Sequence, residues 1–137
     1  MVVDASRART PGVAYRGLTV GVGASGAADA AEVYGLVTRA LDAAGLAHAR
    51  VAALATVRAR GGHPGIVGAA ARLGVPVVAH PPEVLAAVPV AHRSARAAAA
   101  VGTPSVAEAA ALASGGRLLV GRRASAHATC AIAEASG

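Results

Sequence analysis

A glycine-rich segment, Gly21-Val22-Gly23-Ala24-Ser25-Gly26, has the spacing of a loop that binds an anion through backbone amides. It follows an apolar run from Leu18 and precedes a segment of helical periodicity, as the G-x-G-x-x-G dinucleotide fingerprint requires. The acidic residue that would bind the ribose is missing, because Thr56-Val57-Arg58 closes the next apolar run. Three interpretations stay open: glycines that only permit a tight turn and close packing, a loop that binds another anion at a helix N-terminus, and an NADP site with Arg58 on the 2′-phosphate.

Ser25 lies at a strand-to-helix junction, where a nucleophilic serine could stand. No Ser-His-Asp set supports that chemistry, because the aspartates fall in the N-terminal arm or on the first predicted helix. A helix-capping role explains Ser25 without catalysis. The segment Ser105-Val106-Ala107-Glu108 has the form of a capping box, and capping also explains Ser105 and Glu108 better than chemistry does.

Two histidines, His63 and His80, fall on loops that follow predicted strands. They are the candidate proton donors or ligand contacts, and solvated loop histidines are the alternative. The five histidines include no pair four residues apart, and the single cysteine, Cys130, has no partner within the chain. We therefore predict no metal site and no cofactor.

Arginine supplies all 13 of the Lys+Arg residues, which face 7 acidic residues and give a net charge of +6. Without lysine, Schiff-base chemistry and a phosphate-loop NTPase are excluded. Guanidinium groups bind carboxylates in bidentate fashion, so the charge suits a polycarboxylate small molecule. Arg58 and Arg60 follow the second predicted strand, and Arg122 and Arg123 are expected in an exposed turn. Together they predict a basic cleft.

Nucleic acid is a weaker explanation of the positive charge. Tyr15 and Tyr34 are the only aromatic residues, and no nucleic-acid recognition signature stands out. No uncharged apolar stretch reaches the roughly 18 residues that cross a bilayer, and the chain does not open with a secretory signal. We expect a cytoplasmic protein that binds neither nucleic acid nor membrane.

Alternating apolar runs and helical periodicities predict the elements that position these side chains. Strands are expected at 18–23, 51–57, 75–79, 117–120 and 129–133, and helices at about 29–44, 64–73, 81–88 and 105–113. The order predicts an α/β fold, a three-layer α/β/α sandwich with a mostly parallel, mixed sheet of about five strands. Residues 1–15 are expected to form a flexible arm and 16–137 a single domain. With 40 alanines and no Phe or Trp, the core must use small side chains.

Ligands of such sheets bind outside the carboxyl ends of the parallel strands. We therefore predict a ligand site where the loops after the first three strands meet. The candidate ligand-binding residues are Gly21, Gly23, Ser25, Gly26, Thr56, Arg58, Arg60, His63, Ser105, Arg122 and Arg123.

Several sequence blocks resemble the C-terminal domain family of CobE and CbiG, the cobalamin biosynthesis proteins. The resemblance covers about residues 17–134, and its most specific part is Val101-Gly102-Thr103-Pro104-Ser105-Val106-Ala107-Glu108-Ala109-Ala110-Ala111-Leu112. The other blocks are Gly21-Val22-Gly23, Leu54-Ala55-Thr56-Val57, Pro64-Gly65-Ile66, Leu73-Gly74-Val75-Pro76, Leu118-Leu119-Val120 and Thr129-Cys130-Ala131-Ile132-Ala133.

The chain departs from the family pattern at three places. Ala24 and Ser25 stand where the family tends to have Cys-Arg, Arg60 matches a lysine position in charge, and His63 replaces an acid. At these positions the chain lacks the family's residues, so a catalytic role of those residues does not carry over to it. In bifunctional relatives the domain follows a cobalt-precorrin-5A hydrolase domain, for which this chain is too short.

The resemblance implies a standalone protein of corrin-ring synthesis, and the arginines are suited to the acetate and propionate groups of a precorrin. The expected partners are a corrinoid or precorrin molecule and other enzymes of the cobalamin pathway. A small NADP- or nucleotide-binding enzyme that uses the glycine segment is the alternative.

Overall fold

The computed structural model describes residues 17–46, 50–88, 106–113 and 115–134. Ser105 and the predicted arm at 1–15 lie outside these residues. The elements are β1 (Leu18–Ala24), α1 (Ala30–Ala43), β2 (Val51–Val57), the 3-10 turn η1 (Arg58–Arg60), α2 (Pro64–Leu73), β3 (Val77–His80), α3 (Pro82–Ala86), α5 (Val106–Leu112), β4 (Arg117–Ala124) and β5 (Ala128–Glu134).

The strands form one five-stranded sheet in the order β3-β2-β1-β5-β4. β1 pairs in parallel with β2, and β2 pairs in parallel with β3. β5 is antiparallel to both β1 and β4, so β4 runs in the direction of β1. The predicted mixed sheet of about five strands is confirmed, with two parallel and two antiparallel strand pairs. The carboxyl ends of β1, β2, β3 and β4 consequently meet at one edge, which we call the carboxyl edge.

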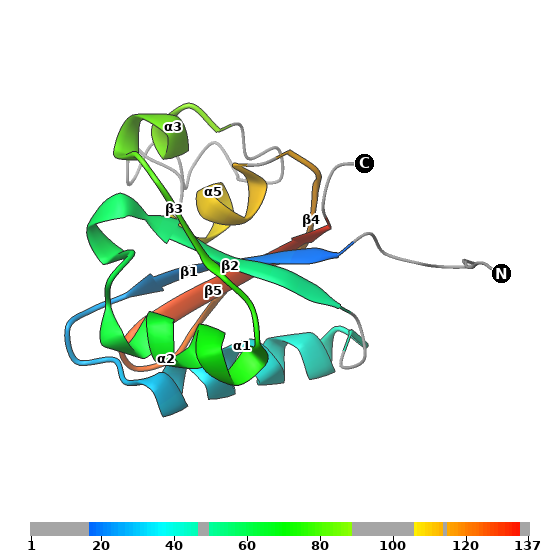
Figure 1. Ribbon diagram of the computed structural model, residues 1–137. Coiled ribbons are helices and arrows are strands. Elements are labelled where there is room, and N and C mark those ends of the chain that lie inside the picture. The colour runs from blue at the N-terminus through cyan, green and yellow to red at the C-terminus, as the bar shows by residue number, and fades with distance from the viewer. Residues whose placement is uncertain (1–16, 47–49, 89–105, 114, 135–137) are drawn as a thin grey trace, which may run out of the picture.

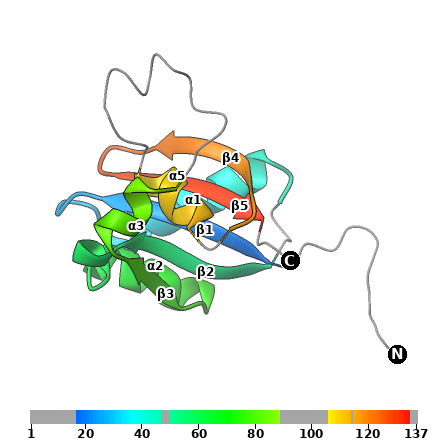
Figure 2. The same cartoon turned by 90° about the horizontal axis from the view of Figure 1, so that it is seen from above.

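Helices cover both faces of the sheet. Figure 1 shows α1 and α2 below the strands and α3 and α5 above them. In Figure 2, seen from above, α5 lies over the middle strands of the sheet. The three-layer α/β/α sandwich is therefore confirmed.

The face toward α1 and α2 carries the larger core side chains. Leu18, Val20 and Val22 alternate along β1 and are fully buried, as are Leu54 of β2 and Ile132 of β5. Every second residue of a strand faces the same side of its sheet, so this alternation directs β1 toward α1. Burying each such side chain contributes about 1.5–3 kcal/mol, which makes this layer the main source of stability.

The opposite face is built from alanine and glycine. Buried alanines of α5, such as Ala107 and Ala111, pack on Ala131 and Ala133 of β5. A Cβ placed on Gly21 would lie 1.8 Å from the carbonyl oxygen of Ala107. Gly21 therefore lets α5 approach the backbone of β1, which explains why this core needs small side chains.

The predicted strand and helix boundaries agree with the structure to within about two residues, except at the last hairpin. His80 was expected on a loop, but it is the last residue of β3, which lies at Val77–His80 and not at the predicted 75–79. Arg122 and Arg123 were expected in an exposed turn, and this prediction was wrong, because β4 extends to Ala124 and Arg123 pairs with Cys130 of β5. The turn of the hairpin is shorter, at residues 125–127. Both arginines are nevertheless exposed.

Candidate ligand-binding site

A hollow of about 600 Å³ opens at the carboxyl edge, and we call it the strand-end hollow. The end of β1, the first residue of α5 and the turn between β4 and β5 line it. Its lining residues are Gly23, Ala24, Ser25, Val106, Arg122, Ala124, Ser125, Ala126, His127, Ala128 and Thr129. Three predicted ligand residues, Gly23, Ser25 and Arg122, therefore lie together there. The described residues that line the hollow supply a guanidinium, hydroxyls and the imidazole of His127, and they include no Phe, Tyr or Trp.

Arg122 is positioned by a bulge in β4. Val120 pairs with Ile132 and Arg123 with Cys130, so three steps along β4 match two along β5. The bulge leaves the Arg122 N–H free of the ladder, and this N–H donates to Oε2 of Glu108 at 3.0 Å. Glu108 lies on α5 with 8% of its surface exposed, so a buried carboxylate holds the backbone of Arg122 beside the hollow.

Glu32 of α1 holds the turn between β4 and β5. Its carboxylate accepts hydrogen bonds from the Ser125 hydroxyl and from the His127 N–H, the latter at 2.6 Å. The Ser25 N–H donates to the carbonyl of His127 at 2.9 Å, which joins the turn to the end of β1. Sequence analysis missed Glu32 as a site residue, because 95 positions separate it from His127 and only the fold brings them together.

Replacing Glu32 tests this anchor through pH. The hydrogen bond from Ser125 and then that from His127 hold the pKa of the Glu32 carboxyl below its usual value. Such a carboxyl adds stability above its unfolded-state pKa and loses that contribution as pH falls through its folded-state pKa. We expect a higher Tm for wild type than for Glu32→Gln at pH 7, and a difference that shrinks from about pH 5 toward pH 3.

Thermal unfolding at each pH measures this difference. The matched control is Glu83→Gln, which changes an exposed carboxylate on α3. Its Tm at pH 7 should lie close to that of wild type, because a substitution on the exposed surface changes stability little. If the Tm difference between wild type and Glu32→Gln is as large at pH 3 as at pH 7, the Glu32 carboxylate does not hold the turn.

His63 has a structural role in the fold. Its side chain is 8% exposed, and its Nδ1 accepts the Gly65 N–H at 3.0 Å as the N-cap of α2. Nδ1 therefore carries no proton, and Nε2 donates to the Ser25 carbonyl at 2.7 Å. Both ring nitrogens are engaged within the fold, between α2 and the loop after β1.

Thr56 is also engaged internally. It is fully buried, and its hydroxyl donates to the Val22 carbonyl at 2.7 Å. The backbone pairing of β1 with β2 ends at Gly21 and Ala55, so the Thr56 hydroxyl joins the two strands just beyond that pairing. Gly21 packs against α5. Neither Gly21 nor Thr56 lines the strand-end hollow.

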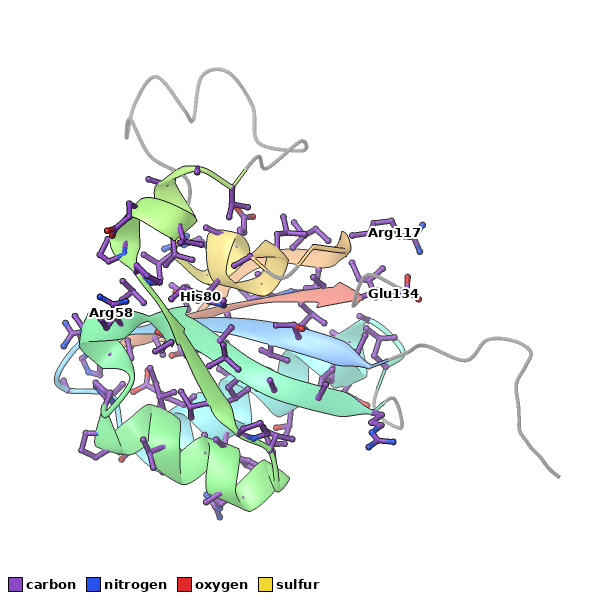
Figure 3. All side chains as sticks on the ribbon, turned by 45° about the horizontal axis from the view of Figure 1, so that its top comes forward. Arg58, His80, Arg117 and Glu134 are labelled. Carbon is purple, nitrogen blue, oxygen red and sulfur yellow. The ribbon has the colours of Figure 1, made fainter. Side chains whose placement is uncertain are left out.

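The remaining candidates lie along the carboxyl edge but away from this hollow. Arg58 and Arg60 are exposed on η1, which follows β2, and β2 lies three strand spacings, about 14 Å, from β4. His80 ends β3 at the edge of the sheet, and its Nε2 is buried without a hydrogen-bond partner among the described residues. Figure 3 shows Arg58 and His80 at one end of the sheet and Arg117 and Glu134 at the other. The four predicted arginines therefore do not share one hollow.

The glycine segment is not a dinucleotide loop. Gly21 and Gly23 were expected in the loop, but they lie within β1, which pairs with β5 as far as Ala24. The loop begins only at Ser25, and Gly26 is exposed with open space around its α-carbon. The N-terminus of α1 is capped by Asp29, whose Oδ1 accepts the Glu32 N–H at 2.8 Å. A carboxylate thus already occupies the helix end that would have met a phosphate.

Metal ligands do not gather in the described part of the chain. No group of three or more His, Cys, Asp or Glu within it has an arrangement that fits a metal ion. Cys130 is buried, and burial raises the pKa of its thiol to about 11, while the Arg123 guanidinium acts in the opposite direction. The longest described helix, α1, has 14 residues, and no described helix is suited to crossing a bilayer.

The sequence matches the family described as Cobalamin synthesis G C-terminus over residues 18–133. The chain belongs to this family. The resemblance identified from the sequence blocks is therefore confirmed, and the chain is a cobalamin biosynthesis protein of the CobE and CbiG type. The alternative of a small NADP- or nucleotide-binding enzyme has no support from the family or from the position of the glycines.

Two crystal structures are similar to this member of the Cobalamin synthesis G C-terminus family. CobE, a protein from the cobalamin (vitamin B12) biosynthetic pathway, is 30% identical with a TM-score of 0.72, over 88% of this chain and 95% of CobE. The cobalamin biosynthesis protein chiG from Agrobacterium tumefaciens is 29% identical with a TM-score of 0.67, over 88% of this chain and 99% of chiG. No curated protein sequence matches the chain.

Proposed function

We propose that this protein binds a corrinoid or precorrin polycarboxylate at the strand-end hollow and passes it on within cobalamin biosynthesis. The observation that carries the proposal is the position of Arg122, whose backbone N–H is held by the Glu108 carboxylate and which lines a hollow on the carboxyl edge. Ligands of open α/β sheets bind at this edge. Membership of a cobalamin biosynthesis family supplies the class of ligand.

The lining of the hollow favours recognition of acid groups over stacking. Corrinoids carry acetate and propionate arms around a wide ring, and a guanidinium binds such carboxylates through paired hydrogen bonds. No Phe, Tyr or Trp side chain of the described residues lines the hollow, so among them the face of the macrocycle has no large aromatic stacking partner. We therefore propose that the ring rests at the mouth of the hollow while its acid arms reach Arg122 and the hydroxyl of Ser25.

We propose that the protein binds and transfers the ligand and that His63 does not donate a proton to it. A donor must present an available proton to the ligand, and the Nε2 proton of His63 is held by the Ser25 carbonyl. The buried, free Cys130 is suited to a reducing compartment, and we propose a cytoplasmic location.

Replacing Arg122 tests the proposal. Hydrogenobyrinic acid is titrated into the protein, and the dissociation constant is taken from the change in its visible absorption. Removing a charge-assisted bond to a carboxylate costs about 1.5–3 kcal/mol. We therefore expect Arg122→Ala to weaken binding at least tenfold.

Arg117→Ala is the matched control, because Arg117 lies on the same strand at the opposite end and pairs with Glu134 at 3.1 Å. It should bind within twofold of wild type, since an exposed ion pair adds little to stability. Equal losses in both variants would show a general effect of charge and contradict the proposed site. Absence of binding by wild type at low salt would contradict the proposed function.

A further inference from the structure

A second hollow of about 490 Å³ lies on the other side of β4, and we call it the helix-side hollow. Residues of α1 and the end of β4 line it, including Leu36, Arg39, Asp42 and Arg123. It shares Ala124 and Ser125 with the strand-end hollow, so the two adjoin across the end of the hairpin.

The bulge in β4 explains why the neighbouring residues Arg122 and Arg123 line different hollows. Arg123 lies opposite Cys130, which is buried in the core cluster that includes α1. Residues directly opposite in an antiparallel pair point to the same face, so Arg123 faces α1. Arg122, one position earlier, has its N–H on Glu108 of α5 and lines the hollow on that side. The two guanidinium groups therefore stand on either side of the edge strand.

The helix-side hollow combines an apolar wall with a positive balance of charge, since Arg39 and Arg123 line it together with Asp42. Leu36 and Ala40 are 5% and 2% exposed and form part of its wall. Within the described part of the chain, neither Arg39 nor Arg123 forms an ion pair with a carboxylate, Asp42 included. Two guanidinium groups from different elements thus converge on one concave surface, which is the chemistry that binds an organic carboxylate.

We infer that one polycarboxylate ligand straddles the turn between β4 and β5, with acid arms in both hollows. Arg122 binds an arm on the α5 side, and Arg123 and Arg39 bind an arm on the α1 side. This inference rests on the proposed function and assigns the helix-side hollow as its second subsite. In this arrangement, the distance between the acid groups of the ligand determines specificity. A wide ring can place acid groups on both sides of the strand, whereas a small tricarboxylate such as citrate cannot reach both sides.

The anchor at Glu32 is part of the same arrangement. The Glu32 carboxylate holds the turn that separates the two hollows, because it accepts hydrogen bonds from the Ser125 hydroxyl and from the His127 N–H. Ser125 lines both hollows. A turn fixed to α1 keeps both subsites in one relative position, so that a rigid ring can engage them together.

The test is a titration of hydrogenobyrinic acid against wild type, Arg123→Ala, Arg39→Ala and the double variant Arg122→Ala/Arg123→Ala. We expect one ligand per protein, a five- to tenfold loss of affinity in each single variant, and at least a fiftyfold loss in the double variant. Citrate should compete only at concentrations at least a hundredfold above the corrinoid. Circular dichroism of each variant verifies that it is folded, and Arg72→Ala is the control, since Arg72 is also a helix-surface arginine but lies over Tyr34.

Several results would overturn the inference. If Arg122→Ala weakens binding while Arg123→Ala and Arg39→Ala bind like wild type, the second subsite is refuted and the proposed function stands. Two ligands per protein would show independent sites and refute the straddling arrangement. If wild type itself does not bind, the proposed function fails and the inference fails with it.

Discussion

Gly21→Ala should cost about 3 kcal/mol or more of unfolding free energy, because overpacking against backbone is relieved only by moving a whole element. The new methyl group would lie 1.8 Å from the Ala107 carbonyl oxygen and 2.6 Å from the Ala111 nitrogen. Both atoms belong to the backbone of α5, which must move away from the sheet. We expect Tm to fall by about 10 °C or more in thermal unfolding.

Gly26→Ala provides the comparison within the same glycine segment. Gly26 is exposed, and a Cβ there would meet nothing within 4 Å. Its unfolding free energy should stay within about 0.5 kcal/mol of wild type. Similar losses in the two variants would mean that the segment acts as a flexible loop and that α5 does not pack on Gly21.

His63→Ala should cost about 2–3 kcal/mol, the second large effect. The change removes the cap on the Gly65 N–H and the bond to the Ser25 carbonyl, and it leaves a void where a buried ring stood. Urea unfolding measures the loss. An alanine variant as stable as wild type would contradict the structural role of this histidine.

His63→Asn separates that structural role from proton transfer. Asparagine is a good N-cap, so this variant should recover about half of the lost stability. It has no acidic ring proton, yet it should bind hydrogenobyrinic acid within twofold of wild type. Intact stability together with lost binding would show that the imidazole acts on the ligand.

The elements were predictable because local patterns determine them. Val51 to Val57 is apolar except for Thr56, and α2 begins at Pro64 and ends before Gly74, whose φ of 73° suits glycine. The order of the strands was not predicted, because the position of β5 between β1 and β4 depends on pairing between the two ends of the described chain. The end of β4 was missed, because charged residues such as Arg122 and Arg123 resemble a turn until pairing with β5 is known.

The candidate site was predictable only as an edge of the sheet. Of the three strand-to-helix loops that were expected to form it, the loop after β1 alone contributes to the strand-end hollow, where Gly23, Ser25 and Arg122 lie together. Sequence patterns did not show that Gly21 packs under α5 or that Thr56 and His63 satisfy internal carbonyl groups, since these contacts join distant segments. The bulge that separates Arg122 from Arg123 depends on the register of β4 and β5, which no local pattern encodes.

Amide chemical-shift mapping by NMR tests most directly that a corrinoid binds at the strand-end hollow. On addition of hydrogenobyrinic acid, the amides of Gly23, Ser25, Arg122 and His127 should shift, because these residues line the hollow. Amides of α2 and of β3 should stay in place. Shifts gathered instead around Arg58 and His80, with the hairpin unaffected, would contradict this site.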